Sequence, residues 1–171
     1  MKSLYLLRHA KSSWAEPGLS DRQRPLNKRG LRDAPVMGER FRERGESLQR
    51  VVSSPALRAH TTAELFARAC GFPTGEIVHE EDLYFLGDRS IEHAILGQDD
   101  QLERLMLVFH NPDITHFANS IDYDFRIDNI PTCGLIKMHC DIAQWSDWSR
   151  DTTTFEYYDF PKNDSAEVRR K

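Results

Sequence analysis

Arg8 and His9 are two adjacent polar residues that end the apolar run "SLYLL" near the start of the chain. Such a continuous run is typical of a strand buried on both faces of a parallel sheet. Two later runs end in the same way: a pair of serines closes "RVVSS", and His110 follows "RLMLVF". Because ligand sites in open α/β sheets form beyond the carboxyl ends of the strands, these residues predict a site at that edge.

Arg58 lies in the first turn of the helix that we predict directly after "RVVSS". Helical side chains lean toward the N-terminus of their helix, so we expect Arg58 to point at the same edge of the sheet. Arginine presents a planar fork of donors that matches phosphate oxygens. A neutral histidine can attack phosphorus, and a second, protonated histidine can hold a phosphoryl oxygen during transfer. Two arginines and two histidines in one pocket therefore predict phosphoryl transfer through a phosphohistidine.

The elements that must position these residues alternate between strands and helices. Strands are expected near residues 3–7, 50–54, 75–80, 104–109, 133–140 and 152–160. Apolar residues at helical spacing predict a helix within residues 25–45. Its buried stripe is expected to contain Leu31, Ala34, Met37 and Phe41. This alternation predicts an α/β fold, a three-layer sandwich with a mostly parallel central sheet and helices on both faces.

Three further helices complete the predicted pattern. One has Ser54 as its N-cap, Pro55 at its first helical position and Gly71 as its stop. A short one is expected near residues 90–96. The last is expected to be capped by Asn111 and opened by Pro112.

The composition indicates one soluble globular domain. The chain has 171 residues, of which 39% are hydrophobic and 29% are charged, and its formal net charge is -4. This balance gives no general attraction to nucleic acid or to an anionic membrane. The N-terminal apolar run stops at Arg8, too early for a signal peptide or a membrane span. We expect one domain over residues 1–160 and a flexible C-terminal tail over residues 161–171.

Other phosphatase and cofactor chemistries lack their motifs. There is no H-E-x-x-H, and His110 and His116 are six residues apart rather than four, so we expect no metal ion. No cysteine is followed six positions later by an arginine, as a cysteine phosphatase would need. No phosphate-binding G-x-x-x-x-G-K-[ST] occurs, so nucleotide binding lacks support, and we expect no cofactor. Three scattered cysteines without a C-x-x-C pair are typical of reduced thiols in the cytoplasm.

Three blocks of the chain resemble one known family in the same order. "LYLLRHAKSSW" resembles the Arg-His-Gly signature of the histidine phosphatase (phosphoglycerate mutase-like) superfamily, with Ala10 in the glycine position. "VVSSPALRAHTTAELF" and "LMLVFHNPDITHFAN" resemble the blocks that carry its second arginine and second histidine. "RHAKSSW", "RPLNKRG" and "PTCG" resemble the SixA-type phosphohistidine phosphatases, the small branch without large insertions. The likeness runs from Leu4 to about Pro161.

The resemblance implies roles for individual residues. The nucleophile that takes up the phosphoryl group would be His9, and its oxygens would be held by Arg8, Arg58 and His110.

Three further residues are candidates for contacts with the substrate. The resemblance makes Arg24, in "RPLNKRG", an additional basic residue on the substrate side. Lys11 and Ser12 lie in the turn after His9, where they could reach phosphate. A solvated basic side chain and a turn-capping hydroxyl are equally good readings of these residues.

A general acid is not obvious in the sequence. Mutases and phosphomonoesterases of this superfamily use a carboxylic acid to protonate the leaving alkoxide. The segment "HEEDLYFLGDRS" offers four carboxylates, Glu80, Glu81, Asp82 and Asp88. Asp82, just before "LY", is the best positional candidate, against the reading of a charged turn. An imidazole leaves far more readily than an alkoxide, so a missing acid favours a phosphohistidine substrate.

The expected function is therefore a metal-independent phosphatase that acts on phosphohistidine in a protein of a signalling pathway. Little chain remains for a lid, so we expect an open pocket with residues 15–23 as its rim. The alternatives are a broad-specificity phosphomonoesterase for small molecules and an inactive phosphate-binding module.

Overall fold

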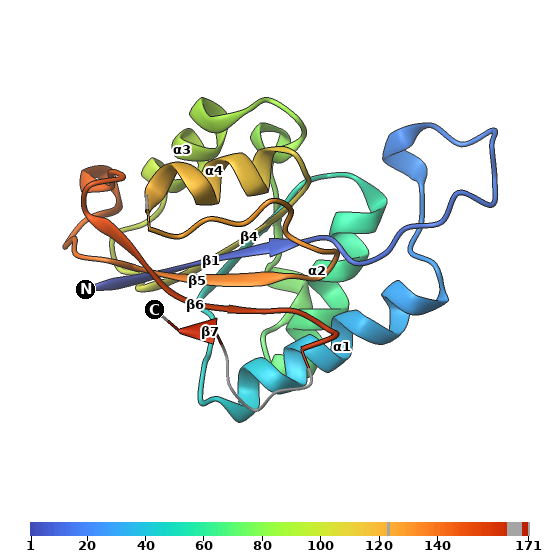
Figure 1. Cartoon of the computed structure of the whole chain (residues 1–171), viewed down its shortest axis with the longest axis horizontal. Coiled ribbons are helices and arrows are strands. Elements are labelled where there is room, and N and C mark those ends of the chain that lie inside the picture. The colour runs from blue at the N-terminus through green and yellow to red at the C-terminus, as the bar shows by residue number, and fades with distance from the viewer. Residues whose placement is uncertain (123, 164–168, 171) are drawn as a thin grey trace.

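The computed structural model describes residues 1–122, 124–163 and 169–170, in which seven strands form one sheet in the order β3-β2-β4-β1-β5-β6-β7 (Figure 1). Their bounds are β1 (Lys2–Arg8), β2 (Arg50–Ser53), β3 (Val78–His79), β4 (Arg104–Phe109), β5 (Leu135–Cys140), β6 (Thr153–Asp159) and β7 (Arg169–Arg170). The pairs of β1 with β4, β4 with β2 and β2 with β3 are parallel, whereas β5, β6 and β7 each run antiparallel to the strand before them in this order. Five of these seven strands therefore share one direction.

Helices cover both faces of the sheet in the described part of the chain (Figure 1). Their bounds are α1 (Lys28–Glu43), α2 (Leu57–Cys70), α3 (Asp88–Leu96) and α4 (Asp113–Ile121). Phe41 of α1 and Phe66 of α2 share a core cluster with Tyr5 of β1, and Phe117 of α4 lies in the cluster on the opposite face. The predicted three-layer α/β sandwich is confirmed.

The central strand β1 shows why its sequence is apolar without alternation. Leu4 and Leu6 belong to the core under α3 and α4, whereas Tyr5 and Leu7 belong to the core under α1 and α2. All four side chains are fully buried. Burial of each contributes about 1.5–3 kcal/mol, so polar residues are confined to the end of the strand.

Leu31 was wrongly predicted to lie in the buried stripe of α1, because its side chain is 49% exposed. Gly30 takes the inward position of this turn instead. A Cβ atom on Gly30 would lie 2.3 Å from the backbone oxygen of Lys11, so the helix meets the turn after β1 backbone to backbone. Ala34, with the later residues of the stripe, is buried as expected.

The predicted starts of two helices are also wrong. Helix α2 begins at Leu57 with Ala56 at the N-cap, because the hydroxyl of Ser54 is engaged at the sheet edge. Helix α4 begins at Asp113, and the side chain of Asn111 donates to the backbone oxygen of Ile130 instead of capping the helix.

The beginning of the predicted tail contacts the body of the protein. The guanidinium of Arg40 donates to the backbone oxygens of Phe160, Pro161 and Asn163. Arg169–Arg170 pair with β6 as strand β7. The remainder of the predicted tail, residues 164–168 and 171, lies outside the described residues. Among the helices that are described, none is long and apolar enough to cross a membrane.

Candidate active site

The predicted site residues lie at one edge of the sheet, just beyond β1, β2 and β4. The backbone N–H of His9 donates to the oxygen of Phe109 (3.1 Å), and that of Ser54 donates to the oxygen of Val108 (2.9 Å). The ladder thus continues one residue past the strands and places His9, Ser54 and His110 side by side. The rings of His9 and His110 are 5.2 Å apart between centroids.

His9 is neutral and keeps one ring nitrogen unprotonated. Its Nδ1 lies 2.7 Å from the backbone oxygen of Ala10. A carbonyl oxygen can only accept a hydrogen bond, so Nδ1 carries the proton and Nε2 keeps its lone pair. Burial, together with the nearby charges of Arg58 and Arg8, lowers the pKa of His9 to about 3.

His110 is held by a serine that sequence analysis assigned to a helix cap. Its Nε2 lies 2.7 Å from the hydroxyl of Ser54, and this hydroxyl oxygen accepts the backbone N–H of Ala56. The hydroxyl proton is then available to Nε2, which leaves the ring proton of His110 on Nδ1. Nδ1 is buried and has no hydrogen-bond partner among the described residues, so its N–H is free to meet a phosphoryl oxygen.

The free enzyme holds His110 in its neutral form, whereas sequence reasoning expected a protonated ring. Burial and the nearby His9 and Arg58 lower the pKa of His110 to about 2. Neutral His110 can still donate one hydrogen bond, and an incoming dianion would favour its protonation.

Arg8 also has an unused donor in the pocket. Its Nη1 donates to the backbone oxygen of Ile130 at 2.6 Å. Its Nε is buried without a hydrogen-bond partner in the described part of the chain. Burial lowers the pKa of Arg8, which shows that the cation loses hydration there.

Arg58 is fixed by a carboxylate that sequence analysis did not identify. Its Nη1 donates to the backbone oxygen of Asp21 (2.6 Å), and its Nη2 donates to Oδ2 of the same residue (2.9 Å). Asp21 begins the short 3-10 helix η1 (Asp21–Gln23), within the predicted rim. Partial burial acts to raise the pKa of Asp21, but hydrogen bonds from Tyr84 and Arg58 lower it to about 2. Asp21 is therefore a counter-ion rather than an acid.

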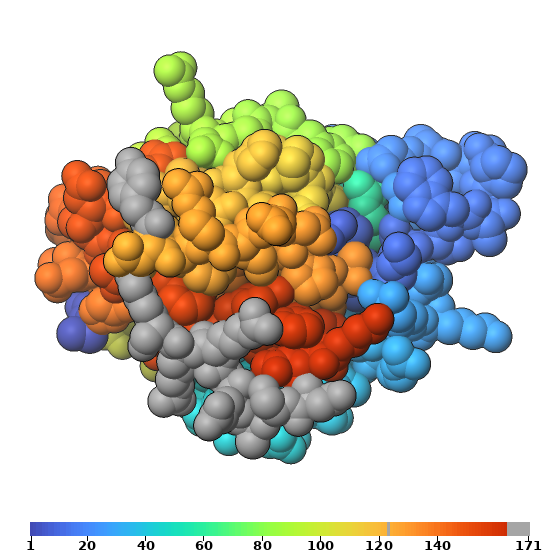
Figure 2. Space-filling model, viewed as in Figure 1, coloured from blue at the N-terminus to red at the C-terminus, as the bar shows by residue number. Residues whose placement is uncertain are grey.

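The three candidate substrate contacts differ in their placement. Arg24 is buried and donates to Asp21 (3.0 Å) and to the hydroxyl of Ser12 (2.5 Å), so both predicted residues join the same network. The exposed ring of Trp14 lies against the guanidinium of Arg24, 3.3 Å away. The side chain of Lys11 is exposed. The segment that carries these residues follows β1 and protrudes at the right of the molecule (Figure 1 and Figure 2).

Asp82 lies in a surface ion pair. Its carboxylate is 2.5 Å from Nδ1 of His93, whose side chain is 81% exposed. Two neighbouring carboxylates are paired as well, Glu81 with Arg22 and Asp88 with Arg150. In the described part of the chain Asp82 pairs with His93 and not with His9 or His110, and its role as general acid remains a prediction.

Tyr84 and Phe85 complete the pocket, and sequence analysis missed both. The hydroxyl of Tyr84 donates to Asp21 at 2.7 Å. The ring of Phe85 stacks on His110 at 4.7 Å with an interplanar angle of 26°. The available signal was the pair of consecutive aromatic residues inside "HEEDLYFLGDRS". Sequence analysis considered only the four carboxylates of that segment as candidates.

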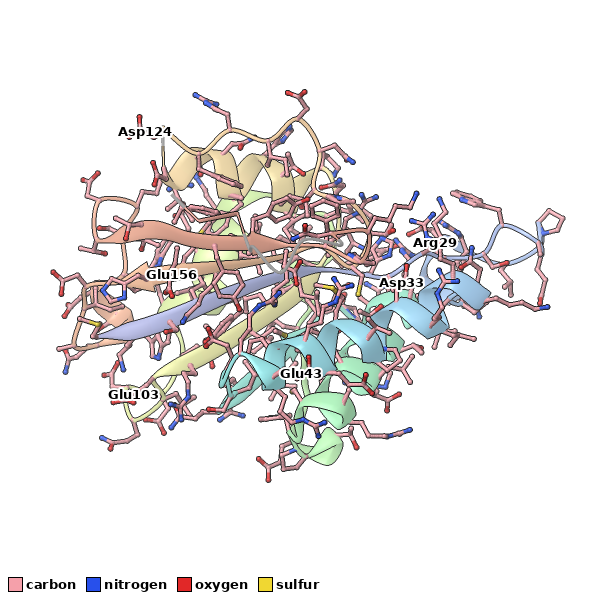
Figure 3. The ribbon with its side chains drawn as sticks, turned by 60° about the horizontal axis from the view of Figure 1, so that its bottom comes forward. Arg29, Asp33, Glu43, Glu103, Asp124 and Glu156 are labelled. Carbon is pink, nitrogen blue, oxygen red and sulfur yellow. The ribbon has the colours of Figure 1, made fainter. Side chains whose placement is uncertain are left out.

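The charges around the two histidines do not cancel. Arg24 and Arg58 pair with the carboxylate of Asp21, whereas Arg8 donates to a backbone oxygen. With both histidines neutral, the three guanidinium groups and this one carboxylate carry a net charge of +2. The whole chain carries -4, and Glu103 lies at the opposite edge of the sheet (Figure 3). The pocket is therefore complementary to a dianion. Nowhere in the described residues do three His, Cys, Asp or Glu side chains gather so that they could hold a metal ion.

Sequence comparisons identify the family. Residues 4–84 match the model of the histidine phosphatase superfamily (branch 1). An uncharacterized protein of Mycobacterium tuberculosis is 30% identical over 150 residues, which are 82% of this chain and 90% of that protein. A Klebsiella pneumoniae protein assigned as phosphoglycerate mutase GpmB is 34% identical over 119 residues, which are 66% of this chain but 53% of that protein.

Solved structures agree with these matches. The Agrobacterium tumefaciens protein assigned as phosphohistidine phosphatase SixA has 27% identity and a TM-score of 0.78, and the match covers 94% of this chain and 98% of that one. A protein histidine phosphatase SixA complexed with tungstate has 18% identity and a TM-score of 0.79 over 93% and 97% of the two chains, which supports the fold. The chain therefore belongs to the histidine phosphatase superfamily, shares its fold with SixA-type structures, and is a phosphatase with a histidine-based mechanism.

Proposed function

We propose that the protein is a metal-independent phosphohistidine phosphatase that acts on a phosphorylated protein. The observation that carries this proposal is the neutral ring of His9 beside a cluster with a net charge of +2. The carboxylate of that cluster, Asp21, is ionised and so is not available as an acid. Such a pocket binds a phosphoryl dianion well but has no proton ready for a strongly basic leaving group. The imidazole of phosphohistidine, with a pKa near ~6.5, does not need one to the same degree.

The mechanism has two steps. In the first, the substrate's ring carries a proton on the nitrogen that does not hold the phosphoryl group, and the Nε2 lone pair of His9 forms a bond to phosphorus. The bond between phosphorus and the substrate's ring nitrogen breaks, and its electron pair leaves with a neutral imidazole. His9 becomes a cationic phosphoimidazole, and the Ala10 carbonyl that accepts its Nδ1 proton stabilises this charge. In the second step, water attacks phosphorus, the electron pair of the P–N bond returns to Nε2, and inorganic phosphate leaves.

Three groups would hold the phosphoryl oxygens during both steps. The Nε–H of Arg8 and the Nδ1–H of His110 are buried donors without partners among the described residues, and the guanidinium of Arg58 lies near His110. Such preorganised donors stabilise charge without reorganisation at the moment of transfer.

A protein substrate in the cytoplasm fits the remaining features. The predicted rim is short, and in the described part of the chain no long insertion follows it, which suits a side chain that projects from a protein domain. Cys70, Cys133 and Cys140 are free thiols, which suits a reducing compartment. The relative assigned as a phosphoglycerate mutase supports the alternative, a phosphomonoesterase for small molecules.

Trapping of the phosphorylated enzyme tests this proposal. The protein would be mixed with a phosphohistidine-bearing protein, a sugar phosphate and an aryl phosphate, and acid-labile phosphate on the enzyme would be measured. We expect label on the wild type and on His116→Ala, a control at an exposed histidine of α4, but none on His9→Ala. Phosphate binding without label or turnover would instead identify an inactive binding module.

The substrate class is tested separately at the four carboxylates of the acidic turn. Conversion of Glu80, Glu81, Asp82 and Asp88 to their amides should slow hydrolysis of aryl and alkyl phosphates more than hydrolysis of phosphohistidine. Equal losses on both classes would remove the leaving-group argument.

A further inference from the structure

Phe85 has an unusual backbone and an exposed ring. Its φ is +56°, a left-handed conformation that large side chains rarely adopt, and its side chain is 43% exposed. Such strain persists only where the surrounding structure enforces it, and it is concentrated at functional sites. The position of the Phe85 ring is therefore set by contacts with neighbouring residues rather than by a favourable local backbone conformation.

The neighbour that holds Phe85 is itself anchored to the active site. The ring of Tyr84 contacts that of Phe85 edge-on, with centroids 4.9 Å apart. The hydroxyl of Tyr84 is bound to Asp21, and the guanidinium of Arg22 lies over the Tyr84 ring at 4.5 Å. The network that fixes Arg58 thus also fixes the position of Phe85.

The ring of Phe85 lines the pocket on the side of the second histidine. It stacks on His110, and the guanidinium of Arg58 lies 6.0 Å from its centroid. His9 and His110 are almost completely buried beneath, whereas Phe85 is substantially open to solvent. The ring therefore lies between the buried His110 and solvent, and we call this partly exposed border the mouth of the site.

The leaving group must depart at the mouth. Phosphoryl transfer places the attacking and leaving atoms in line, so the leaving group lies on the side of phosphorus away from Nε2 of His9. Buried groups hold the equatorial oxygens, which leaves the exposed mouth for the rest of the substrate. An aromatic face at this point offers stacking to a flat leaving group and nothing comparable to a flexible alkyl chain.

We propose that Phe85 is a specificity-determining residue that stacks against a planar leaving group, and so selects phosphoryl groups carried on an aromatic ring such as imidazole. This inference rests on the proposed function and deepens it. It assigns the preference for a ring to a contact at the mouth, in addition to the easy departure of imidazole.

The test compares leaving groups in matched variants. We expect Phe85→Leu to lower kcat/KM for a phosphorylated imidazole and for an aryl phosphate by about three- to tenfold, the size of one stacking contact, and to change that for glycerol phosphate less than twofold. Phe85→Tyr, which keeps the ring, should retain the preference. Leu86→Ala, at the adjacent exposed residue, should leave all three values unchanged.

Two outcomes would overturn the inference. Equal losses on ring and alkyl substrates would mean that Phe85 only positions His110, and no loss on any substrate would mean that the ring is not used. Thermal unfolding of each variant checks that the fold is kept. Failure of the proposed function would look different, because the wild type would then show no higher kcat/KM for phosphohistidine than for other phosphates. This test instead measures how the ratio of kcat/KM between ring and alkyl substrates changes in the variants.

Discussion

Lys137 and Arg8 are both cations on neighbouring strands of the same sheet, but their surroundings are opposite. Lys137 pairs with Glu46 at 2.8 Å and with Glu156 at 3.1 Å, the latter on β6 (Figure 3). Tyr5 donates to the second oxygen of Glu46 at 2.6 Å. We refer to Tyr5, Glu46, Lys137 and Glu156 as the Lys137 cluster. The positive charge of Lys137 is fully compensated by these two carboxylates.

The active-site cluster, formed by Arg8, Arg24, Arg58 and Asp21, has more positive than negative charge. Its net charge is +2, and the Nε of Arg8 and the Nδ1 of His110 have no partner among the described residues. A buried donor without a partner costs about 1–3 kcal/mol, and at this site a bound phosphoryl group would supply the missing acceptors. Buried donors without partners also occur away from the site, for example at the Nε of Arg50 and of Arg104. Free donors together with an excess of positive charge therefore distinguish the active-site cluster from the Lys137 cluster.

The sharpest way to break this comparison is Arg8→Met. We expect kcat/KM to fall by about 10³-fold or more, because a donor and a charge on the phosphoryl group are lost. The free energy of unfolding should stay the same or rise by about 1 kcal/mol, since a poorly paired cation leaves the interior. The oxygen of Ile130 keeps a donor in Asn111, at 3.2 Å. Steady-state kinetics and urea unfolding measure the two effects, and a large loss of stability with activity retained would contradict the assignment.

Lys137→Met should give the reverse pattern. We expect the free energy of unfolding to fall by about 2 kcal/mol, because Glu46 and Glu156 lose their cation, while kcat/KM stays within about twofold. The double variant with Glu46→Gln should recover part of the stability. Lys162→Met, at an exposed lysine, serves as the control. Unchanged stability in Lys137→Met would show that the Lys137 cluster is not structural.

The two buried histidines predict a pH dependence of stability. Their pKa values, about 3 for His9 and about 2 for His110, lie below the unfolded value near ~6.5, so the unfolded chain binds more protons between these limits. Stability from this source is complete above about pH 6.5 and is lost as the pH falls toward 3. Each histidine should contribute a slope of about 1.4 kcal/mol per pH unit.

Denaturant unfolding between pH 7 and pH 4 measures this slope. His110→Gln should remove about half of the histidine contribution, whereas His116→Gln, at an exposed position, should remove none. An unchanged slope in His110→Gln would show that this ring is not buried in its neutral form.

The smallest expected effect sharpens the role of Asp21. Asp21→Asn raises the net charge of the active-site cluster from +2 to +3, so inorganic phosphate should inhibit about threefold more tightly. At the same time kcat should fall by about threefold, because Arg58 loses its charged anchor. Product inhibition and kcat are measured in the same assay. If both binding and turnover weaken, Asp21 is only a structural support.

The sequence was most informative where one local pattern determined the outcome. Apolar runs that end in polar residues identified β1, β2 and β4, and their shared direction was enough to gather His9 and His110 at one edge. The prediction failed where a side chain chose a tertiary partner over a local one. Ser54 has the type and position of an N-cap, yet its hydroxyl binds His110.

Residues from irregular segments were the hardest to predict. Asp21 and Tyr84 are 63 positions apart and meet through a single hydrogen bond, and neither sits in a periodic pattern. Their segments contain several charged residues, and only the folded structure shows which of these faces the site. The prediction that Leu31 is buried was wrong for a related reason, because Gly30, one residue earlier, takes the inward position.

The close approach of Gly30 to Lys11 has a consequence for the backbone after His9. The chain that follows the nucleophile rests directly on a helix backbone, with no compressible side chain between them. The backbone just after His9 therefore has little room to shift toward α1, and a larger residue in place of Gly30 would displace it.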